Sequence, residues 1–189
     1  MRRGDECNAF LVRFDLARLE VPPQACVAKA TVSFFVWDPS STGKTKVRAF
    51  PLKTAWDEAT VTWREPAAGQ SWQCGKGFAF GSDTGPSGPA VVVQPDDGDD
   101  TVDPPIEYEL DVTELVHSWL VGGTPNHGLA IAPEIDPSVD ENSKTRFQIY
   151  GSEHSQEQYT PKLNVALLTR PESGTASERD ASKRDMSRY

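Results

Sequence analysis

The sequence lacks the features of several large protein classes. No uninterrupted apolar run is longer than four residues, as in Ala90–Val93, whereas a membrane-spanning helix needs about 20. Residues 1–10, MRRGDECNAF, carry charges but no apolar stretch, so they do not resemble a signal peptide. With 19 Lys and Arg against 28 Asp and Glu, the net charge is −9, which disfavours general binding to nucleic acid. The sequence therefore predicts no membrane span and no nucleic-acid partner.

Cysteine and histidine are also scarce. The three cysteines, Cys7, Cys26 and Cys74, form no Cys-x-x-Cys pair, and the three histidines have no zinc-ligand spacing. Free thiols are the preferred interpretation, although one pair could form a disulfide in an oxidising compartment. Residues 81–85 spell GSDTG and not Gly-x-Ser-x-Gly, and no pair of carboxylates stands out for glycoside hydrolysis. The sequence therefore favours a protein that is not an enzyme.

Positive charge is missing from the middle of the chain. Residues 77–143 contain no Lys or Arg and 14 carboxylates, half of the total. Within them, residues 96–103 read DDGDDTVD, and oxygen-rich loops of this kind suit Ca²⁺, which takes about six to eight oxygen ligands. A solvated acidic loop is the alternative interpretation. The candidate Ca²⁺ ligands are Asp96, Asp97, Asp99, Asp100 and Asp103.

Apolar residues alternate with polar ones along much of the chain, which is typical of half-buried strands. Strands are predicted at Phe10–Leu16, Val27–Trp37, Lys44–Leu52, Ile106–Val112, Leu129–Ala132, Lys144–Tyr150 and Lys162–Leu168. In the second of these, Ala28, Ala30, Val32, Phe34 and Val36 are expected to share one face. One short helix is predicted at Thr113–Val121, ended by two glycines. This pattern predicts an all-β protein, an antiparallel β-sandwich of jelly-roll type.

The domain organisation follows from composition. Residues 1–169 are expected to form a single sandwich module, with an acidic, Pro- and Gly-rich insertion at about residues 78–105. Residues 170–189 have almost no large apolar side chains and mixed charge, so they are predicted to be a disordered polar tail.

Four motifs in order carry a resemblance to a known family. They are LVRFDL at Leu11–Leu16, WDEATVTW at Trp56–Trp63, LDVTELVHSWLVGGTPNHGLAI at Leu110–Ile131 and IYGSEHSQEQYTPKLNV at Ile149–Val165. Together they resemble the DNRLRE domain, also called carbohydrate-binding module family 96 and related to the disaggregatase-type repeats, over about residues 8–168.

The resemblance implies a β-sandwich module of a secreted or surface protein, in some cases one that binds alginate-like polysaccharides. Members generally have a leading strand before the segment that resembles Leu11–Leu16, whereas nine or ten polar residues precede it here. An open sheet edge near Phe10–Leu16 is therefore expected, and such an edge invites self-association by pairing with another chain.

The residues expected to bind ligand are mainly basic. Lys46 and Arg48 share one side of a predicted strand, and Lys144 and Arg146 share one side of another, in phase with Tyr150. A guanidinium group can bind a carboxylate through two parallel hydrogen bonds, and a tyrosine ring can stack on a pyranose ring. The sequence therefore predicts a non-catalytic carbohydrate-binding module for an acidic polysaccharide such as alginate. A structural or adhesive module without sugar affinity is the alternative.

The tryptophans have two interpretations. Trp56, Trp63 and Trp119 lie within apolar patterns, so packing in the core is preferred over stacking on a sugar. Trp37 and Trp72 are the exposed aromatic residues expected to bind a sugar if the basic residues do not.

Overall fold

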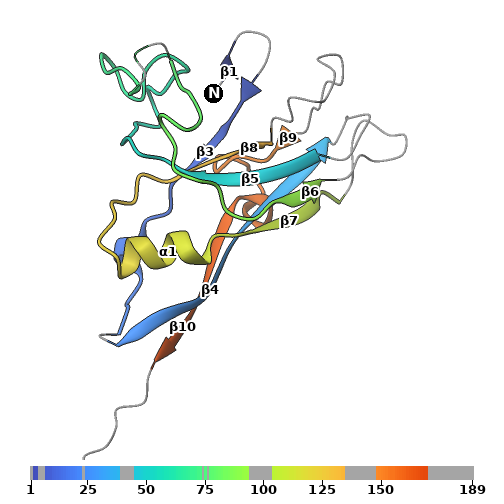
Figure 1. The fold of residues 1–189 in the computed structure, drawn as a ribbon. Coiled ribbons are helices and arrows are strands. Elements are labelled where there is room, and N and C mark those ends of the chain that lie inside the picture. The colour runs from blue at the N-terminus through green and yellow to red at the C-terminus, as the bar shows by residue number, and fades with distance from the viewer. Residues whose placement is uncertain are drawn as a thin grey trace, which may run out of the picture.

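The computed structural model describes residues 2–3, 7–22, 24–38, 45–73, 75, 77–93, 104–134 and 148–169. All of its strand pairs are antiparallel, and they form two four-stranded sheets and a small hairpin (Figure 1). The hairpin joins β1 (Arg2–Arg3) to β2 (Cys7–Asn8). The β-sandwich predicted from the alternation is therefore confirmed.

Each large sheet is named here after its central strand. The β5 sheet has the order β3-β8-β5-β6, with strands Phe10–Val12, Leu129–Pro133, Thr45–Pro51 and Val91–Val93. The β4 sheet has the order β10-β4-β7, with strands Lys162–Thr169, Ala25–Asp38 and Ile106–Asp111, and β9 (Gln148–Ile149) also pairs with β4. Helix α1 (Thr113–Leu120) follows β7, and two 3₁₀ helices lie at Leu16–Arg18 and Glu157–Tyr159.

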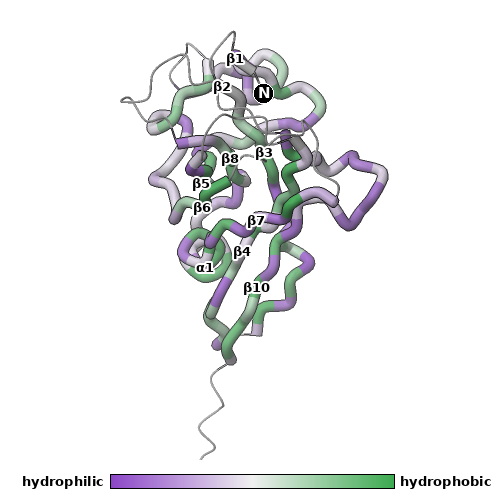
Figure 2. Tube along the Cα trace, turned by 90° about the vertical axis from the view of Figure 1, so that its right-hand side faces the viewer, coloured by the Kyte–Doolittle hydropathy of each residue, from purple (hydrophilic) through white to green (hydrophobic). Residues whose placement is uncertain are grey.

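The main core lies between the two sheets. Val32, Phe34 and Val36 of β4 are fully buried and pack with Val47 of β5 and Ile131 of β8. Figure 2 shows the matching alternation of hydrophobic and hydrophilic residues along β10. Complete burial of such a side chain stabilises the fold by about 1.5–3 kcal/mol, so this inner layer fixes how the sheets face each other.

A second core covers the outer face of the β5 sheet. Trp56, Trp72 and Phe78 come from the long segment after β5, and they pack over Ala130 and Ala132 of β8. Small side chains on β8 leave room for these large rings. The outer face of the β4 sheet differs, because Lys29, Glu107 and Glu109 are exposed there. The β4 sheet is therefore where strand side chains reach solvent.

Strands β1, β2 and β6 were not predicted, and some of the predicted elements differ from the observed ones at particular residues. The strand predicted at Phe10–Leu16 ends at Val12, because the Asp15 side chain accepts a hydrogen bond from the Ala17 N–H at 3.0 Å and starts a 3₁₀ helix. Ala28 was expected to face inward but is exposed, while Val27 is buried. The pairing of β4 with β10 shifts register there, so the alternation changes phase.

Several predictions fall on parts of the chain outside the described residues. These are the candidate Ca²⁺ ligands at 96–103, the basic residues Lys144 and Arg146, and the tail at 170–189. At the N-terminal side, β3 pairs with β8, and no second partner strand for β3 is found within the described ranges. Self-association through this edge stays a prediction.

Candidate functional site

The basic residues predicted on β5 lie where the pattern places them, but one of them already has partners. Lys46 is exposed and Arg48 is half-buried. The Arg48 Nη1 donates a hydrogen bond to the Gly88 carbonyl at 2.9 Å, and its Nε lies 3.2 Å from a carboxylate oxygen of Glu134. The guanidinium thus ties the segment after Gly85 to the end of β8, with two of its five N–H donors facing partners inside the protein.

Tyr150 lies on the other sheet. It directly follows β9, and its N–H donates a hydrogen bond to the Phe35 carbonyl on β4 at 3.2 Å. The structure therefore does not place Tyr150 on the sheet that carries Lys46 and Arg48. Lys144 and Arg146, the other two predicted ligand residues, are outside the described part of the chain.

Tyr150 belongs instead to a group of half-buried rings, here called the aromatic surface. Its members are Phe35, Trp37, Tyr150, His154 and Tyr159. The rings of Trp37 and Tyr150 are 6.0 Å apart and 17° from parallel, and those of Tyr150 and Tyr159 are 5.7 Å apart and 20° from parallel. Tyr159 also meets Phe35 edge-on at 5.3 Å.

Local backbone structure brings these rings together. Phe35 and Trp37 occupy outward positions of β4, since their neighbours Phe34 and Val36 point into the core. After Tyr150 the chain turns, and the His154 Nδ1 accepts a hydrogen bond from the Gln156 N–H at 3.2 Å. The 3₁₀ helix at Glu157–Tyr159 then returns the chain over β4 just before β10 begins.

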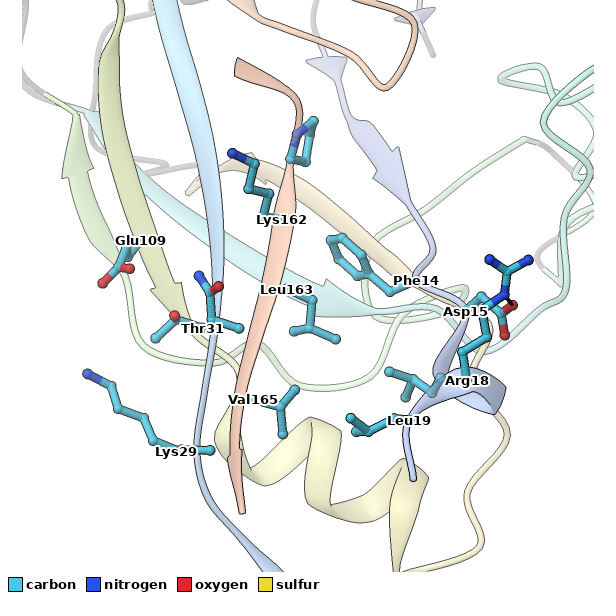
Figure 3. Close-up of a pocket in the computed structure, with 14 residues that line it drawn as sticks. Phe14, Asp15, Arg18, Leu19, Lys29, Thr31, Glu109, Lys162, Leu163 and Val165 are labelled. Carbon is cyan, nitrogen blue, oxygen red and sulfur yellow. Dashed lines mark ion pairs between the residues drawn. The ribbon is translucent and has the colours of Figure 1, made fainter. Parts of the chain in front are cut away.

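A polar strip continues the aromatic surface along the outer face of the β4 sheet. The pairing places Glu109 and Lys162 beside Ser33 on opposite sides of β4. One step along, Asp111 and Asn164 flank Thr31, and the Asn164 amide donates to the Ser33 hydroxyl at 3.2 Å. Figure 3 shows Thr31, Lys29 and Glu109 on this side of β10. Thr31 and Ser33 themselves are buried, so the strip offers amide, carboxylate and ammonium groups beside the rings.

One carboxylate of the strip has a shifted pKa. The Thr113 N–H donates a hydrogen bond to the Asp111 carboxylate at 2.9 Å. This bond, with a further one from the Thr113 hydroxyl, lowers the pKa of Asp111 below its ordinary value of 3.8, and Lys29 contributes in the same direction. Asp111 is thus held as an anion where β7 passes into α1.

The predicted tryptophan roles divide between the two cores and the aromatic surface. Trp56 is 7% exposed and its indole N–H donates to the His127 carbonyl at 2.8 Å. Trp72 was an alternative sugar-binding residue, but it is only 1% exposed, because it is enclosed with Phe78 over the β5 sheet. That expectation was wrong for Trp72. Trp37 is half-buried and belongs to the aromatic surface, and sugar binding by this ring stays a prediction.

Sequence reasoning missed Phe35, His154 and Tyr159 as site residues. Alternation had placed Phe35 and Trp37 opposite the core face, and this was a usable signal. The sequence offered no comparable signal for His154 and Tyr159, because they reach β4 only through the turn and the 3₁₀ helix.

Other site classes find little support among the described residues. No group of three or more His, Cys, Asp and Glu side chains within them is arranged to hold a metal ion. Cys26 is exposed and has no disulfide partner in this part of the chain. In the same residues, no helix combines the length and the hydrophobicity needed to cross a membrane.

Comparison with known families gives one match. Residues 3–165 match the disaggregatase related repeat domain. No curated protein matches the chain, and no solved structure does. The match spans both sheets, the aromatic surface and the polar strip. The chain therefore belongs to the disaggregatase related repeat domain family.

Proposed function

We propose that this chain is a non-catalytic carbohydrate-binding module and that the aromatic surface is its binding site. The observation that carries the proposal is the set of near-parallel, half-buried rings of Trp37, Tyr150 and Tyr159. Aromatic rings bind the apolar faces of sugar rings, while the polar tips of Tyr and Trp remain hydrogen-bonded. Contiguous half-exposed aromatic groups are uncommon on a protein surface without a binding role.

The charges beside the aromatic surface favour a neutral sugar chain. Glu107 and Glu109 are exposed on the neighbouring strand β7, and Glu153 and Glu157 are exposed in the turn that carries the rings. Carboxylates accept hydrogen bonds from sugar hydroxyls, but they repel a polyuronate at contact distance. An acidic polysaccharide such as alginate stays the second ligand class, and the exposed residues Lys29 and Lys162 of the polar strip favour it, as does Lys46 on β5.

The family and the resemblance to the DNRLRE domain support the remaining parts of the proposal. We place the module in a secreted or surface protein, where polysaccharides are accessible. We assign no catalytic step to it, because the described residues of the site provide ring stacking and hydrogen bonding.

Affinity electrophoresis in gels that contain neutral glucans, mannans, alginate or pectate tests the proposal. We expect retardation by a neutral glycan, with a loss of about tenfold in affinity for Trp37→Ala and for Tyr150→Ala, as expected when about 1–2 kcal/mol of stacking is removed. Phe80→Ala is the matched control, since Phe80 is a half-buried ring that packs against Phe50 over the β5 sheet.

The outcomes separate the candidate functions. Retardation by alginate alone, abolished by salt and unaffected by Trp37→Ala, would favour the acidic ligand predicted from the sequence. No retardation by any glycan would favour a structural or adhesive module.

A further inference from the structure

A hollow lies along the free edge of strand β10. Strand β10 lies at the edge of the β4 sheet, and no strand among the described residues pairs with its other side. A cavity of about 820 Å³ runs along it and is lined by residues on both faces of the strand. In Figure 3, Lys29 and Thr31 lie on the side of β10 where β4 pairs with it, whereas Phe14 and Leu19 lie on the side away from β4. On the outer face the hollow extends across β4 to Glu109 of β7, and Phe14 and Leu19 line its other part. An additional strand at the free edge would lie in the part of the hollow next to Phe14 and Leu19.

Hydrogen bonds on β4 show which main-chain groups of β10 face this hollow. The Ala30 N–H donates to the Thr113 hydroxyl and the Ala30 carbonyl accepts from the Val112 N–H, both at 2.9 Å. Both groups of Ala30 therefore point away from β10. Val165 lies opposite Ala30, and opposite residues in an antiparallel pair exchange either both hydrogen bonds or neither. The N–H and C=O of Val165 thus point to the free edge, and so do those of Leu163, two residues before it.

The side chains around the free edge set the chemistry of the occupant. Leu163 and Val165 are half-buried and face the apolar side with Phe14 and Leu19. On the outer face, Lys162 is exposed. A strand that pairs with β10 would place alternate side chains on these two faces, so apolar residues on the inner face and acidic residues on the outer face fit best.

Other charges at the hollow do not change this conclusion. Arg18 lies 3.3 Å from the Asp15 carboxylate, and both side chains are largely exposed to solvent, so opposite charges stand side by side there. Lys29, opposite Ala166 of β10, adds a second positive charge to the outer face. Glu109 also lines the hollow and adds a negative charge to its outer face, but it lies on β7, on the far side of β4 from the free edge.

We propose that the free edge of β10 binds an extended peptide segment of a partner protein by strand addition, and that this segment alternates apolar with acidic side chains. Main-chain hydrogen bonds to Leu163 and Val165 would supply affinity, and the apolar hollow would select every second side chain. None of the rings of the aromatic surface lines this hollow, although Lys162 and Asn164 belong both to the hollow and to the polar strip.

A fluorescent seven-residue peptide that alternates Val with Glu is the probe, measured by fluorescence anisotropy with the full chain. We expect saturable binding that is weakened about tenfold by Val165→Pro, because Pro removes the N–H with which Val165 would bind the added strand. Val165→Ala is the matched control: it keeps the N–H and should weaken binding by less than about threefold. Lys162→Glu, an exposed change, should also weaken it.

Hydrogen exchange of the unmodified chain gives a test that does not depend on any variant folding. With the Val–Glu peptide present, the amides of Leu163 and Val165 should become protected, whereas those of Asn164 and Ala166, which face β4, should change little. A peptide of the same composition with its valines consecutive should give neither binding nor protection.

Three results would overturn the proposal. One is the absence of saturable binding by the alternating peptide, and another is equal binding by the consecutive-valine peptide. The third is a dimerisation of the chain, seen in sedimentation to depend on concentration, that Val165→Pro abolishes and that the peptide does not inhibit. The occupant of the free edge would then be a second copy of the chain.

Discussion

The Asn126 side-chain amide donates a hydrogen bond to the Phe14 carbonyl at 2.9 Å, across 112 residues of chain. The carbonyl oxygen of the same side chain accepts from the Gly128 N–H at 3.0 Å. Gly128 itself has φ +86° and lies against the main chain of Val12 and Arg13. The Asn-x-Gly-Leu part of the third motif therefore joins the start of β8 to the end of β3, and its role is structural.

Replacement of Gly128 by Ala should be strongly destabilising. A Cβ there would overlap the Val12 carbonyl oxygen and the backbone would still need a positive φ. We expect a loss of about 3 kcal/mol or more in the free energy of unfolding, since backbone strain alone costs about 1–3 kcal/mol. Urea unfolding followed by tryptophan fluorescence measures this loss.

Gly123→Ala is the matched control for Gly128→Ala. Gly123 has φ +70°, but a Cβ there would meet no atom within 4 Å. It should therefore show only the conformational cost of about 1–2 kcal/mol. Equal losses for the two variants would mean that the close approach to Val12 contributes nothing.

Asp83 should be sensitive to the loss of its charge. It is fully buried, and its two carboxylate oxygens accept hydrogen bonds from the Gln73 N–H at 2.7 Å and the Ala79 N–H at 2.8 Å. An Asn side chain has one acceptor oxygen, so Asp83→Asn would set an NH₂ group against one of these donors. We expect a destabilisation of about 1–3 kcal/mol, measured by thermal unfolding. Unchanged glycan binding by the folded variant would confirm a structural role.

The shifted pKa of Asp111 predicts a pH-dependent contribution to stability. Because the pKa in the folded state lies below 3.8, the ordinary value, the carboxylate stabilises the fold fully above that pH. The contribution is lost as the pH falls through the folded-state pKa. Asp111→Asn should therefore lower the urea midpoint near neutral pH, and the difference from the unmodified chain should shrink as the pH approaches about 2. An equal difference at both pH values would contradict this assignment.

Much of the fold could be predicted from local pattern. Alternation located β4, β5, β7, β8 and β10, and the residues from Asp111 to Gly123 defined α1. The shift of register at Ala28 was not predictable, because it depends on how β10 pairs with β4. The site was harder for the same reason: Phe35 and Tyr159 meet only after the sheet and the turn have formed. Trp72 is buried because the long segment after β5 packs over the outer face of the β5 sheet, and no pattern in the sequence predicts that packing.

Ca²⁺ binding stays a prediction from the sequence alone. The acidic segment at 96–103 lies outside the described residues, and its five aspartates supply oxygen ligands of the kind Ca²⁺ prefers. If the folded chain binds Ca²⁺, the ion must raise the melting temperature according to its concentration relative to its Kd. Thermal unfolding in millimolar CaCl₂ and in chelator tests this, and Asp99→Asn with Asp100→Asn should remove the increase. Identical melting curves would exclude the site.

Arg48 provides the sharpest contrast between the sequence-based ligand site and the structure. From the sequence we expect Arg48→Ala to weaken binding of an acidic polysaccharide, because the guanidinium would form two parallel hydrogen bonds to a sugar carboxylate. In the structure the guanidinium holds the Gly88 carbonyl and the Glu134 carboxylate, and the Gly88 N–H in turn donates to the Ala49 carbonyl beside β5. Its main effect should therefore be on the free energy of unfolding.

We expect Arg48→Ala to lower the free energy of unfolding by about 1–2 kcal/mol, since it removes a hydrogen bond and an ion pair from a half-buried group. Glycan affinity should be unchanged when it is measured well below the melting temperature. Lys46→Ala is the control, because Lys46 is an exposed residue on the same side of β5 and should change stability by less than about 0.5 kcal/mol. A loss of affinity for alginate in Arg48→Ala with unaltered stability would instead place the guanidinium in contact with the ligand, because a side chain that acts only within the fold cannot change binding without changing unfolding.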